Sequence, residues 1–233
     1  MNLVKKDKVG EGGSWKVFQC EAMDYQFEWP LVLKVSKGKS PLFIQHNIRI
    51  HEQIQSLGLP TLALLKTVTF ADELAMIGEY LNTNGWLFVS PNRVITDLQR
   101  AFRLQETGTT VFDNEPLAEQ ILYDHKLSEL HNFQDFLDNA IRDLKIASRA
   151  KLELYFDSYF FGFKRGHTRS EIQYKIGDFD QIFYKPRVPE TELLAYNIGE
   201  FNDTMQAFIR NFIVTANQPP YLEMTMSKLA KRS

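Results

Sequence analysis

The feature of this chain that most restricts its fold is a glycine-rich turn between two strand-like runs. Residues 9–18 read VGEGGSWKVF, and the next strand-like run, LVLKV, covers residues 31–35. Glycines let backbone N–H groups approach phosphate oxygens closely, and a lysine on the following strand, Lys34, supplies positive charge aimed at the same oxygens. This order predicts a β-rich amino-terminal part that binds nucleotide phosphates, and it favours a nucleotide-dependent phosphotransferase.

Composition excludes several classes of protein. The chain has 233 residues, of which 44% are hydrophobic and 24% charged, and its formal net charge of -2 gives no reason to expect nucleic-acid binding. Its one cysteine, Cys20, cannot form an internal disulfide, and residues 1–8 lack the apolar core of a secretory signal. No stretch approaches the roughly 20 apolar residues of a membrane span. We therefore expect a soluble protein of a reducing compartment, without a membrane or nucleic-acid partner.

Up to about residue 81 the pattern favours strands. Four runs are short, rich in β-branched or apolar residues and bounded by turn formers: residues 15–21, 29–35, 62–70 and 74–80. Between the second and the third, Ser40 and Pro41 predict an N-cap and a first-turn proline for a helix that runs to Leu57, where Gly58 and Pro60 end it. The expected order is strand, strand, helix, strand, strand.

After a turn cluster at residues 82–85 the period of the apolar residues becomes helical. Helices are predicted near residues 94–104, 116–131, 133–150 and 191–215. Two strand-like runs, residues 152–163 and 171–184, flank a basic polar hairpin at 164–170, which we interpret as a solvated turn. The second part of the chain is therefore expected to be mainly α, and the fold class to be α+β.

Three side chains are candidates for a phosphate and metal site. Lys34 lies among apolar strand residues, so its ammonium needs a partner if it points inward. Glu52 is the predicted partner, because Ile44, Ile48 and Glu52 recur at steps of four along the helix. Asp178 follows a strand-like run, where a carboxylate suits Mg²⁺, an ion that prefers oxygen ligands. Taken singly, each residue is equally explained as a solvated lysine, an edge glutamate or a turn aspartate.

Several residues follow one another in the order, and at nearly the spacing, of a known superfamily. These are Gly10, Gly12, Val17, Lys34, Glu52, the segment Glu79-Tyr80-Leu81, Asp178 and Phe179. The chain resembles the protein kinase superfamily, and in particular a small atypical kinase of bacterial or viral type. The resemblance implies one kinase-like domain over residues 1–233, bilobal, with a β-rich amino lobe at 1–81, a mainly helical carboxyl lobe at 82–233, and ATP bound between them.

The resemblance also implies roles for individual residues. The phosphates would lie under the turn formed by Gly10, Gly12, Gly13 and Ser14. Lys34 would hold the α and β phosphates and pair with Glu52, Asp178 would hold Mg²⁺, and the backbone from Glu79 to Leu81 would bind adenine. The chain departs from the family pattern at Trp15, which replaces the last glycine of the turn, and at Asp180, which replaces the glycine after Asp-Phe.

The catalytic carboxylate has two candidate registers. Asp157, between the long helix and the hairpin, is expected to orient the attacking hydroxyl and accept its proton, although Gly162 then stands where a second metal ligand is usual. In the alternative register Asp157 holds the metal and Glu153 is the acid–base residue. The Arg142-Asp143 pair resembles a catalytic-loop motif, but it lies in an apolar helical stripe and is interpreted as structural.

The sequence therefore predicts an ATP- and Mg²⁺-dependent kinase that acts on Ser or Thr of a protein substrate, which for an injected effector would be a host protein. Its location is then the cytoplasm or a host cytosol. A small-molecule or sugar kinase is the nearest alternative, and the Gly-Asp-Phe-Asp run at 177–180 favours it. A pseudokinase that binds nucleotide or a partner without catalysis is the third reading. The acceptor, the regulation and the oligomeric state are not encoded in any motif found.

Overall fold

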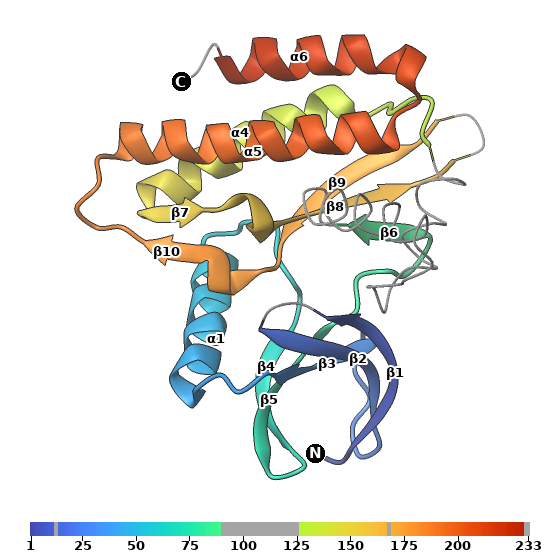
Figure 1. The fold of residues 1–233 in the computed structure, drawn as a ribbon, viewed down its shortest axis with the longest axis vertical. Helices are drawn as coiled ribbons and strands as arrows, with labels where there is room; N and C mark the ends of the chain where they lie inside the picture. The colour runs from blue at the N-terminus through green and yellow to red at the C-terminus, as the bar shows by residue number, and fades with distance from the viewer. Residues whose placement is uncertain (12–13, 90–125, 167–168, 231–233) are drawn as a thin grey trace, which may run out of the picture.

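A computed structural model describes residues 1–11, 14–89, 126–166 and 169–230. Its amino-terminal part is a five-stranded antiparallel sheet, at the bottom of Figure 1, whose strand order is β1-β2-β3-β5-β4. The strands are β1 (Leu3–Glu11), β2 (Trp15–Ala22), β3 (Leu31–Ser36), β4 (Leu65–Phe70) and β5 (Glu73–Glu79). Four of them match predicted runs, whereas β1 was not predicted.

Helix α1 (Pro41–Ser56) connects β3 to β4 beside this sheet (Figure 1). Its start is encoded locally, because the Ser40 hydroxyl accepts a hydrogen bond from the Phe43 N–H at 3.3 Å and Pro41 occupies the first turn. The helix ends before Gly58, whose φ of 69° is a left-handed conformation that glycine adopts without strain. Both boundaries agree with the prediction.

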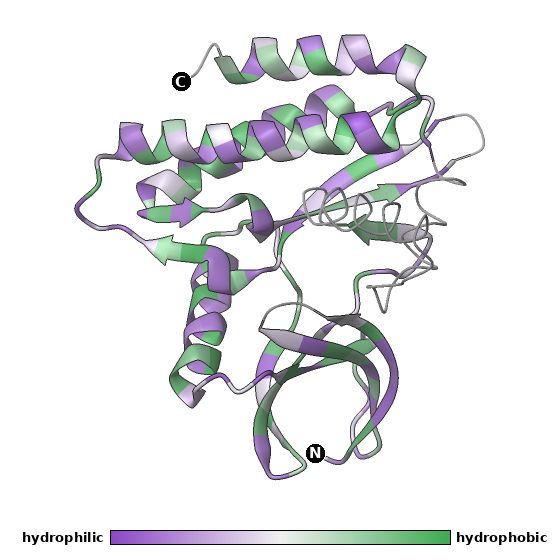
Figure 2. Ribbon diagram, viewed as in Figure 1, coloured by the Kyte–Doolittle hydropathy of each residue, from purple (hydrophilic) through white to green (hydrophobic). Residues whose placement is uncertain are grey.

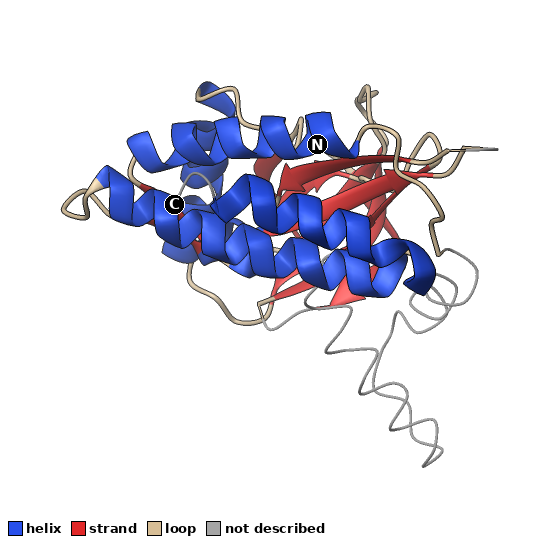
Figure 3. Ribbon diagram, turned by 90° about the horizontal axis from the view of Figure 1, so that it is seen from above, coloured by secondary structure: helices blue, strands red, loops and turns tan. Residues whose placement is uncertain are grey.

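The carboxyl-terminal part places helices on a second set of strands. The strands β6 (Trp86–Val89), β8 (Tyr159–Lys164) and β9 (Glu171–Ile176) form one antiparallel sheet, and β7 (Leu152–Leu154) pairs with β10 (Ile182–Tyr184). Helix α5 (Glu190–Phe212) packs against both α4 (Phe133–Arg149) and α6 (Gln218–Ala230). Seen from above in Figure 3, these helices lie over the strands, and the two termini are at opposite ends of the molecule in Figure 1.

Amphipathic helices and aromatic side chains form the main core. Figure 2 shows hydrophobic and hydrophilic residues alternating along the helical ribbons, as expected for helices with one buried face. Phe161 of β8 contacts Phe136, Phe201 and Phe208 from α4 and α5 at ring-centroid distances of 5.6–5.9 Å. The same connected core reaches Trp15 and Ile44 of the amino-terminal part, so it is continuous between the sheet and the helices.

Three polar contacts join the amino-terminal part to strand β9. The Ile176 N–H donates to the Pro60 carbonyl at 2.8 Å, and the Thr61 hydroxyl donates to the Ile176 carbonyl at 2.8 Å. The Lys175 ammonium contacts both Glu79 oxygens at 2.8 Å. Backbone and ionic contacts therefore fix the end of β5 against the start of the aspartate-bearing segment.

The predicted elements of the second part agree in kind and differ in detail. The long strand-like runs at 152–163 and 171–184 are each divided by a short 3-10 turn, η1 (Phe156–Ser158) and η2 (Phe179–Gln181). Strand β6 and helix α6 were missed, and the predicted helices at 94–104 and most of 116–131 lie outside the described residues. The α+β class is confirmed, while the expected lobe boundary at residues 81 and 82 stays a prediction.

Candidate functional site

The glycine-rich turn connects β1 to β2. Gly10 pairs with Val17 in the antiparallel ladder, and the Ser14 carbonyl accepts a hydrogen bond from the Lys37 N–H at 3.0 Å. Gly12 and Gly13, which were predicted to line the phosphates, lie outside the described residues. The bond between Lys37 and Ser14 ties the residue before β2 to the residue after β3.

Lys34 lies in the middle of the sheet, opposite Val17 of β2 and Met76 of β5. Its ammonium is 5.3 Å from the ring centroid of Trp15, and the Trp15 indole stacks on Phe43 of α1 at 5.6 Å. Within the described part of the chain no carboxylate lies within 4.0 Å of the Lys34 ammonium. An aromatic contact thus stands where an ion pair was expected.

The predicted partner of Lys34 does not face it. Glu52 is exposed, whereas the buried face of α1 carries Ile44, Asn47 and His51, so the prediction that Glu52 shares the isoleucine stripe is wrong. An α-helix turns about 100° per residue, so steps of four drift by about 40° each and place residue 52 roughly 80° from residue 44. The structure does not bring Glu52 to the lysine.

His51 occupies the inner position of α1 instead. Its Nε2 lies 2.8 Å from the Leu62 carbonyl, and its ring meets Phe179 edge-on at 5.3 Å. Burial lowers the pKa of His51, so its imidazole is neutral at physiological pH. The helix is thus anchored to the Asp178-Phe179 segment by a ring contact that the sequence pattern did not reveal.

Asp178 is buried and is surrounded by other charged side chains. Burial and a hydrogen bond with Asp180 together raise the pKa of Asp178 to about 8, although the Lys34 ammonium opposes them by lowering this pKa. The Asp157 carboxylate is close enough to raise the pKa of Asp178 as well. Lys34, Asp157 and Asp180 therefore all lie near enough to Asp178 to act on its carboxyl group, and Asp180 is the one of these residues to which no role was assigned from sequence.

Backbone contacts fix the turn that carries Asp157. The Phe156 N–H donates to the Glu200 carboxylate of α5 at 2.9 Å, and the Gly177 N–H donates to the Ser158 carbonyl at 3.0 Å. The second bond joins the Asp157 turn directly to the residue before Asp178. Two segments separated by the β8–β9 hairpin are thereby held side by side.

The alternative acid–base residue has a different environment. Glu153 lies in β7 opposite Phe183, and its carboxylate is 3.3 Å from the Lys185 ammonium. Unlike Asp157, it does not perturb the pKa of Asp178. Both registers use Asp157 near Asp178, and which carboxylate is the acid–base residue stays a prediction.

Two further positions have structural explanations. Gly162 lies in β8 opposite Phe88, and a Cβ there would come within 2.6 Å of the Phe88 ring, so glycine is required by packing. Asp143 of α4 is buried and accepts a hydrogen bond from the Tyr174 hydroxyl at 2.9 Å. Asp143 is a core residue, in agreement with its interpretation as a structural aspartate.

The segment after β5 combines a fixed carboxylate with a free backbone donor. Glu79 uses its side chain for Lys175 and for the Ala63 N–H, which it accepts at 2.7 Å. The Leu81 carbonyl accepts the Thr83 N–H at 2.8 Å, while the Leu81 N–H has no partner among the described residues. A Cβ at Gly78 would lie 3.3 Å from atoms of Leu64 and Leu65, so the back of the site is filled there.

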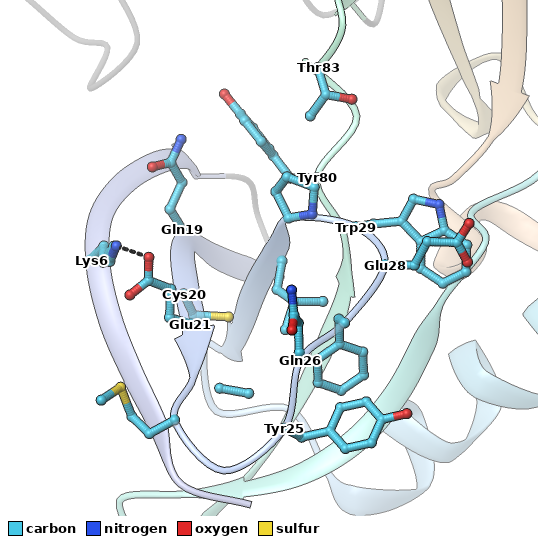
Figure 4. A pocket seen from close by; sticks show the side chains of 15 residues that line it. Lys6, Gln19, Cys20, Glu21, Tyr25, Gln26, Glu28, Trp29, Tyr80 and Thr83 are labelled. Carbon is cyan, nitrogen blue, oxygen red and sulfur yellow. Dashed lines mark hydrogen bonds and ion pairs between the residues drawn. The ribbon is translucent and has the colours of Figure 1, made fainter.

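A separate cavity lies elsewhere in the described residues. Figure 4 shows this space of about 700 Å³ at one end of the amino-terminal sheet, and its lining includes Gln19, Cys20, Trp29 and Tyr80. Lys34 and the three aspartates do not line it. Burial raises the pKa of the Cys20 thiol to about 11, so this cysteine is not a nucleophile at neutral pH. The titratable groups of the candidate site, Lys34 and the three aspartates, thus lie outside this cavity.

Two further features are absent from the described residues. They contain no group of three or more His, Cys, Asp or Glu side chains arranged to hold a metal ion. None of their helices is long and apolar enough to cross a membrane.

Comparison with known proteins supports the fold. The sequence matches no protein-family model, and no curated protein matches it. The structure is similar to the crystal structure of the kinase domain of PF14_0431, with a TM-score of 0.50 and 9% sequence identity. The match covers 88% of this chain and 63% of that chain, so this chain spans less than two thirds of the kinase domain it resembles. At this identity the likeness concerns the fold alone, and it shows that the chain has a kinase-like fold.

Proposed function

We propose that this protein is an ATP- and Mg²⁺-dependent kinase that transfers the γ-phosphoryl group to a hydroxyl, with Ser or Thr of a protein as the first candidate acceptor. One observation carries the proposal. Lys34 and Asp157 come from two segments of the chain other than that of Asp178, and both lie close enough to Asp178 to shift its pKa. A lysine and two carboxylates near one another, in a chain with a glycine-rich turn, suit a phosphoryl group bridged by a metal ion.

The aspartates suit Mg²⁺. Asp180 Oδ1 is buried without a hydrogen-bond partner, and burial together with its neighbour leaves Asp178 with a pKa of about 8, so a divalent cation would stabilise the ionised pair. Mg²⁺ commonly takes one or two protein carboxylates and completes its shell with phosphate and water. Asp178 and Asp180 would hold the ion, which supplies charge neutralisation at the phosphates.

The remaining roles follow from position. Lys34 offsets phosphate charge, and Asp157 orients the acceptor hydroxyl and takes its proton. The free Leu81 N–H is a donor for the nucleotide base at the end of β5. The structure offers no support for Glu52 in catalysis, because that carboxylate is exposed.

One observation favours a small-molecule acceptor. Strand β10 ends at Tyr184 and α5 begins at Glu190, so only residues 185–189 connect them. This leaves little surface on which an extended peptide could lie. A second observation favours nucleotide binding without transfer, because Gly162 is committed to packing and supplies no second metal ligand.

A transfer assay tests these candidates together. Purified full-length protein is incubated with γ-labelled ATP, Mg²⁺ and either a generic protein acceptor or a panel of sugars, beside Lys34→Met and Asp178→Asn. Label on protein that is lost in both variants supports a protein kinase, and label on a sugar supports the alternative acceptor.

Label that persists unchanged in both variants would refute the assignment of the site. Mg²⁺-dependent ATP binding with no transfer to any acceptor would identify the chain as a nucleotide-binding pseudokinase. The matched control is Asp203→Asn, which removes an exposed carboxylate of α5 and leaves Asp157 intact.

A further inference from the structure

Trp15 is the residue through which Lys34 is connected to α1. Trp15 and Val17 point to one face of β2, and Lys34 is directly opposite Val17, so Trp15 is the diagonal neighbour of Lys34 on that face. An ammonium within about 6 Å of an aromatic centroid is attracted to the ring face. The observed 5.3 Å places Lys34 within this range.

The Trp15 indole itself packs against a second aromatic ring. Phe43, in the first turn of α1, stacks on Trp15 with a centroid distance of 5.6 Å and an interplanar angle of 27°. Trp15 is only 5% exposed, and its Nε1 is buried without a hydrogen-bond partner. A buried N–H without an acceptor is unfavourable, so the orientation of the ring is set by its aromatic and cationic contacts and not by a hydrogen bond.

The predicted ion pair between Lys34 and Glu52 is not formed. Among the carboxylates that the structure describes, none forms an ion pair with Lys34, and Glu52 is exposed. Lys34 thus contacts the Trp15 ring, and that ring in turn contacts Phe43. Within the described part of the chain, this is the aromatic route from the ammonium to α1.

We propose that Trp15 is a positioning residue, which holds the Lys34 ammonium toward the phosphate site and couples it through Phe43 to α1, in place of an ion pair with a helix glutamate. The part of this inference that concerns nucleotide affinity depends on the proposed kinase function. The placement of Lys34 by the indole does not.

The first measurement needs no nucleotide. Trp15→Leu, Trp15→Phe and Glu52→Gln are compared with the wild type by brief acylation with an N-hydroxysuccinimide ester, and modification of Lys34 is quantified by peptide mass spectrometry relative to the exposed Lys66. We expect acylation of Lys34 to rise roughly 5- to 30-fold in Trp15→Leu, the range that a partly desolvated cation–π contact implies. Trp15→Phe should stay within about threefold of the wild type, and Glu52→Gln should leave the rate unchanged.

The second measurement is the affinity for a non-hydrolysable ATP analogue with Mg²⁺, by calorimetry. We expect the variants to rank in the same order by Kd. The Kd should be raised roughly 5- to 30-fold in Trp15→Leu and should return toward the wild-type value in Trp15→Phe. Trp86→Leu is the matched control, because it makes the same change at a half-buried indole far along the chain. A purely structural role would weaken folding and not rank the variants by ring character.

Several outcomes would overturn the proposal. One is a Trp15→Leu protein in which Lys34 reacts at the wild-type rate, and another is a Glu52→Gln protein in which it reacts as fast as in Trp15→Leu. If circular dichroism shows that Trp15→Leu does not fold, Phe43→Leu provides the test of the proposal. This variant keeps the Trp15 indole but removes the ring that packs against it. Faster acylation of Lys34 in Phe43→Leu supports the coupling, and an unchanged rate contradicts it. If the wild type binds no nucleotide, the kinase proposal fails. The acylation rates of Lys34 still test the role of Trp15 in that case, because they require no nucleotide.

Discussion

The two sides of the candidate site are built in different ways. On the lysine side, formed by Trp15, Lys34 and Phe43, position depends on aromatic contacts at 5.3 and 5.6 Å. On the aspartate side, formed by Asp157, Asp178 and Asp180, position depends on backbone hydrogen bonds of the two 3-10 turns and their flanking strands. Directional bonds tolerate little change, whereas ring contacts can be exchanged for other rings. We therefore expect the aspartate side to be the more sensitive to substitution.

The largest effect is expected at Asp157. Asp157→Asn keeps the volume of the side chain and removes its ability to accept a proton, so phosphoryl transfer should fall roughly 10²- to 10⁴-fold with little change in ATP affinity. Single-turnover rates of the variant and of the Asp203→Asn control measure this. Transfer by Asp157→Asn at the control rate would move the catalytic role elsewhere, with Glu153 the next residue to substitute.

A smaller effect is expected from packing beneath the aspartate side. Gly162→Ala would place a methyl group against the Phe88 ring, so the free energy of unfolding should fall by about 1–3 kcal/mol. The control is Gly199→Ala in α5, where nothing lies within 4 Å of the new Cβ and a gain of roughly 0.5–1 kcal/mol is expected. Denaturant melts measure both, and equal changes at the two glycines would contradict this account of Gly162.

The pH dependence of stability distinguishes the sides further. Because the pKa of Asp178 is raised to about 8 in the folded protein from an ordinary value of 3.8, the folded state holds its proton more tightly than the unfolded chain does. That contribution to stability is complete below pH 4 and is lost as the pH rises through 8. Without metal, the melting temperature of the wild type should therefore fall between pH 5 and 8, relative to the melting temperature of Asp178→Asn.

Melting curves in a chelator across this pH range give the measurement, and adding Mg²⁺ should restore the wild type but not the variant. If the melting temperatures of the two proteins changed in parallel with pH, the pKa of Asp178 would not be raised in the folded protein.

The smallest effect is expected on the lysine side at Glu52. Glu52→Gln changes an exposed carboxylate, so the free energy of unfolding should move by less than about 0.5 kcal/mol and phosphoryl transfer should be unchanged. A loss of transfer as large as that of Lys34→Met would mean that the lysine side uses the helix glutamate after all. The comparison of the two sides would then have to be abandoned.

The difference between the sides also explains what the sequence could predict. Local signals identified α1 through Ser40 and Pro41, whereas Lys34, Asp157 and Asp178 became candidates through the resemblance to kinases. Glu52 was misplaced because steps of four do not follow the 3.6-residue turn of a helix. The role of Trp15 was hidden, because a tryptophan in a strand pattern looks like any core residue until its neighbours across the sheet are known.

The missed elements have equally physical causes. Strand β1 carries three lysines and an aspartate, and an edge strand that pairs with one neighbour accepts such polarity. Helix α6 begins with Gln218 followed by two prolines, which end a helix internally but are tolerated in its first turn, where N–H groups have no partner within the helix. In both cases the tertiary position of the element decides, and the local sequence does not.

The central claim is that Lys34 and the aspartates form one Mg²⁺–nucleotide site. Calorimetric titration of the full chain with a non-hydrolysable ATP analogue, with and without Mg²⁺, tests it most directly. We predict binding that requires Mg²⁺, that is lost in both Lys34→Met and Asp178→Asn, and that persists in Asp157→Asn. Nucleotide binding that ignores Mg²⁺ or survives in both of the first two variants would contradict the account.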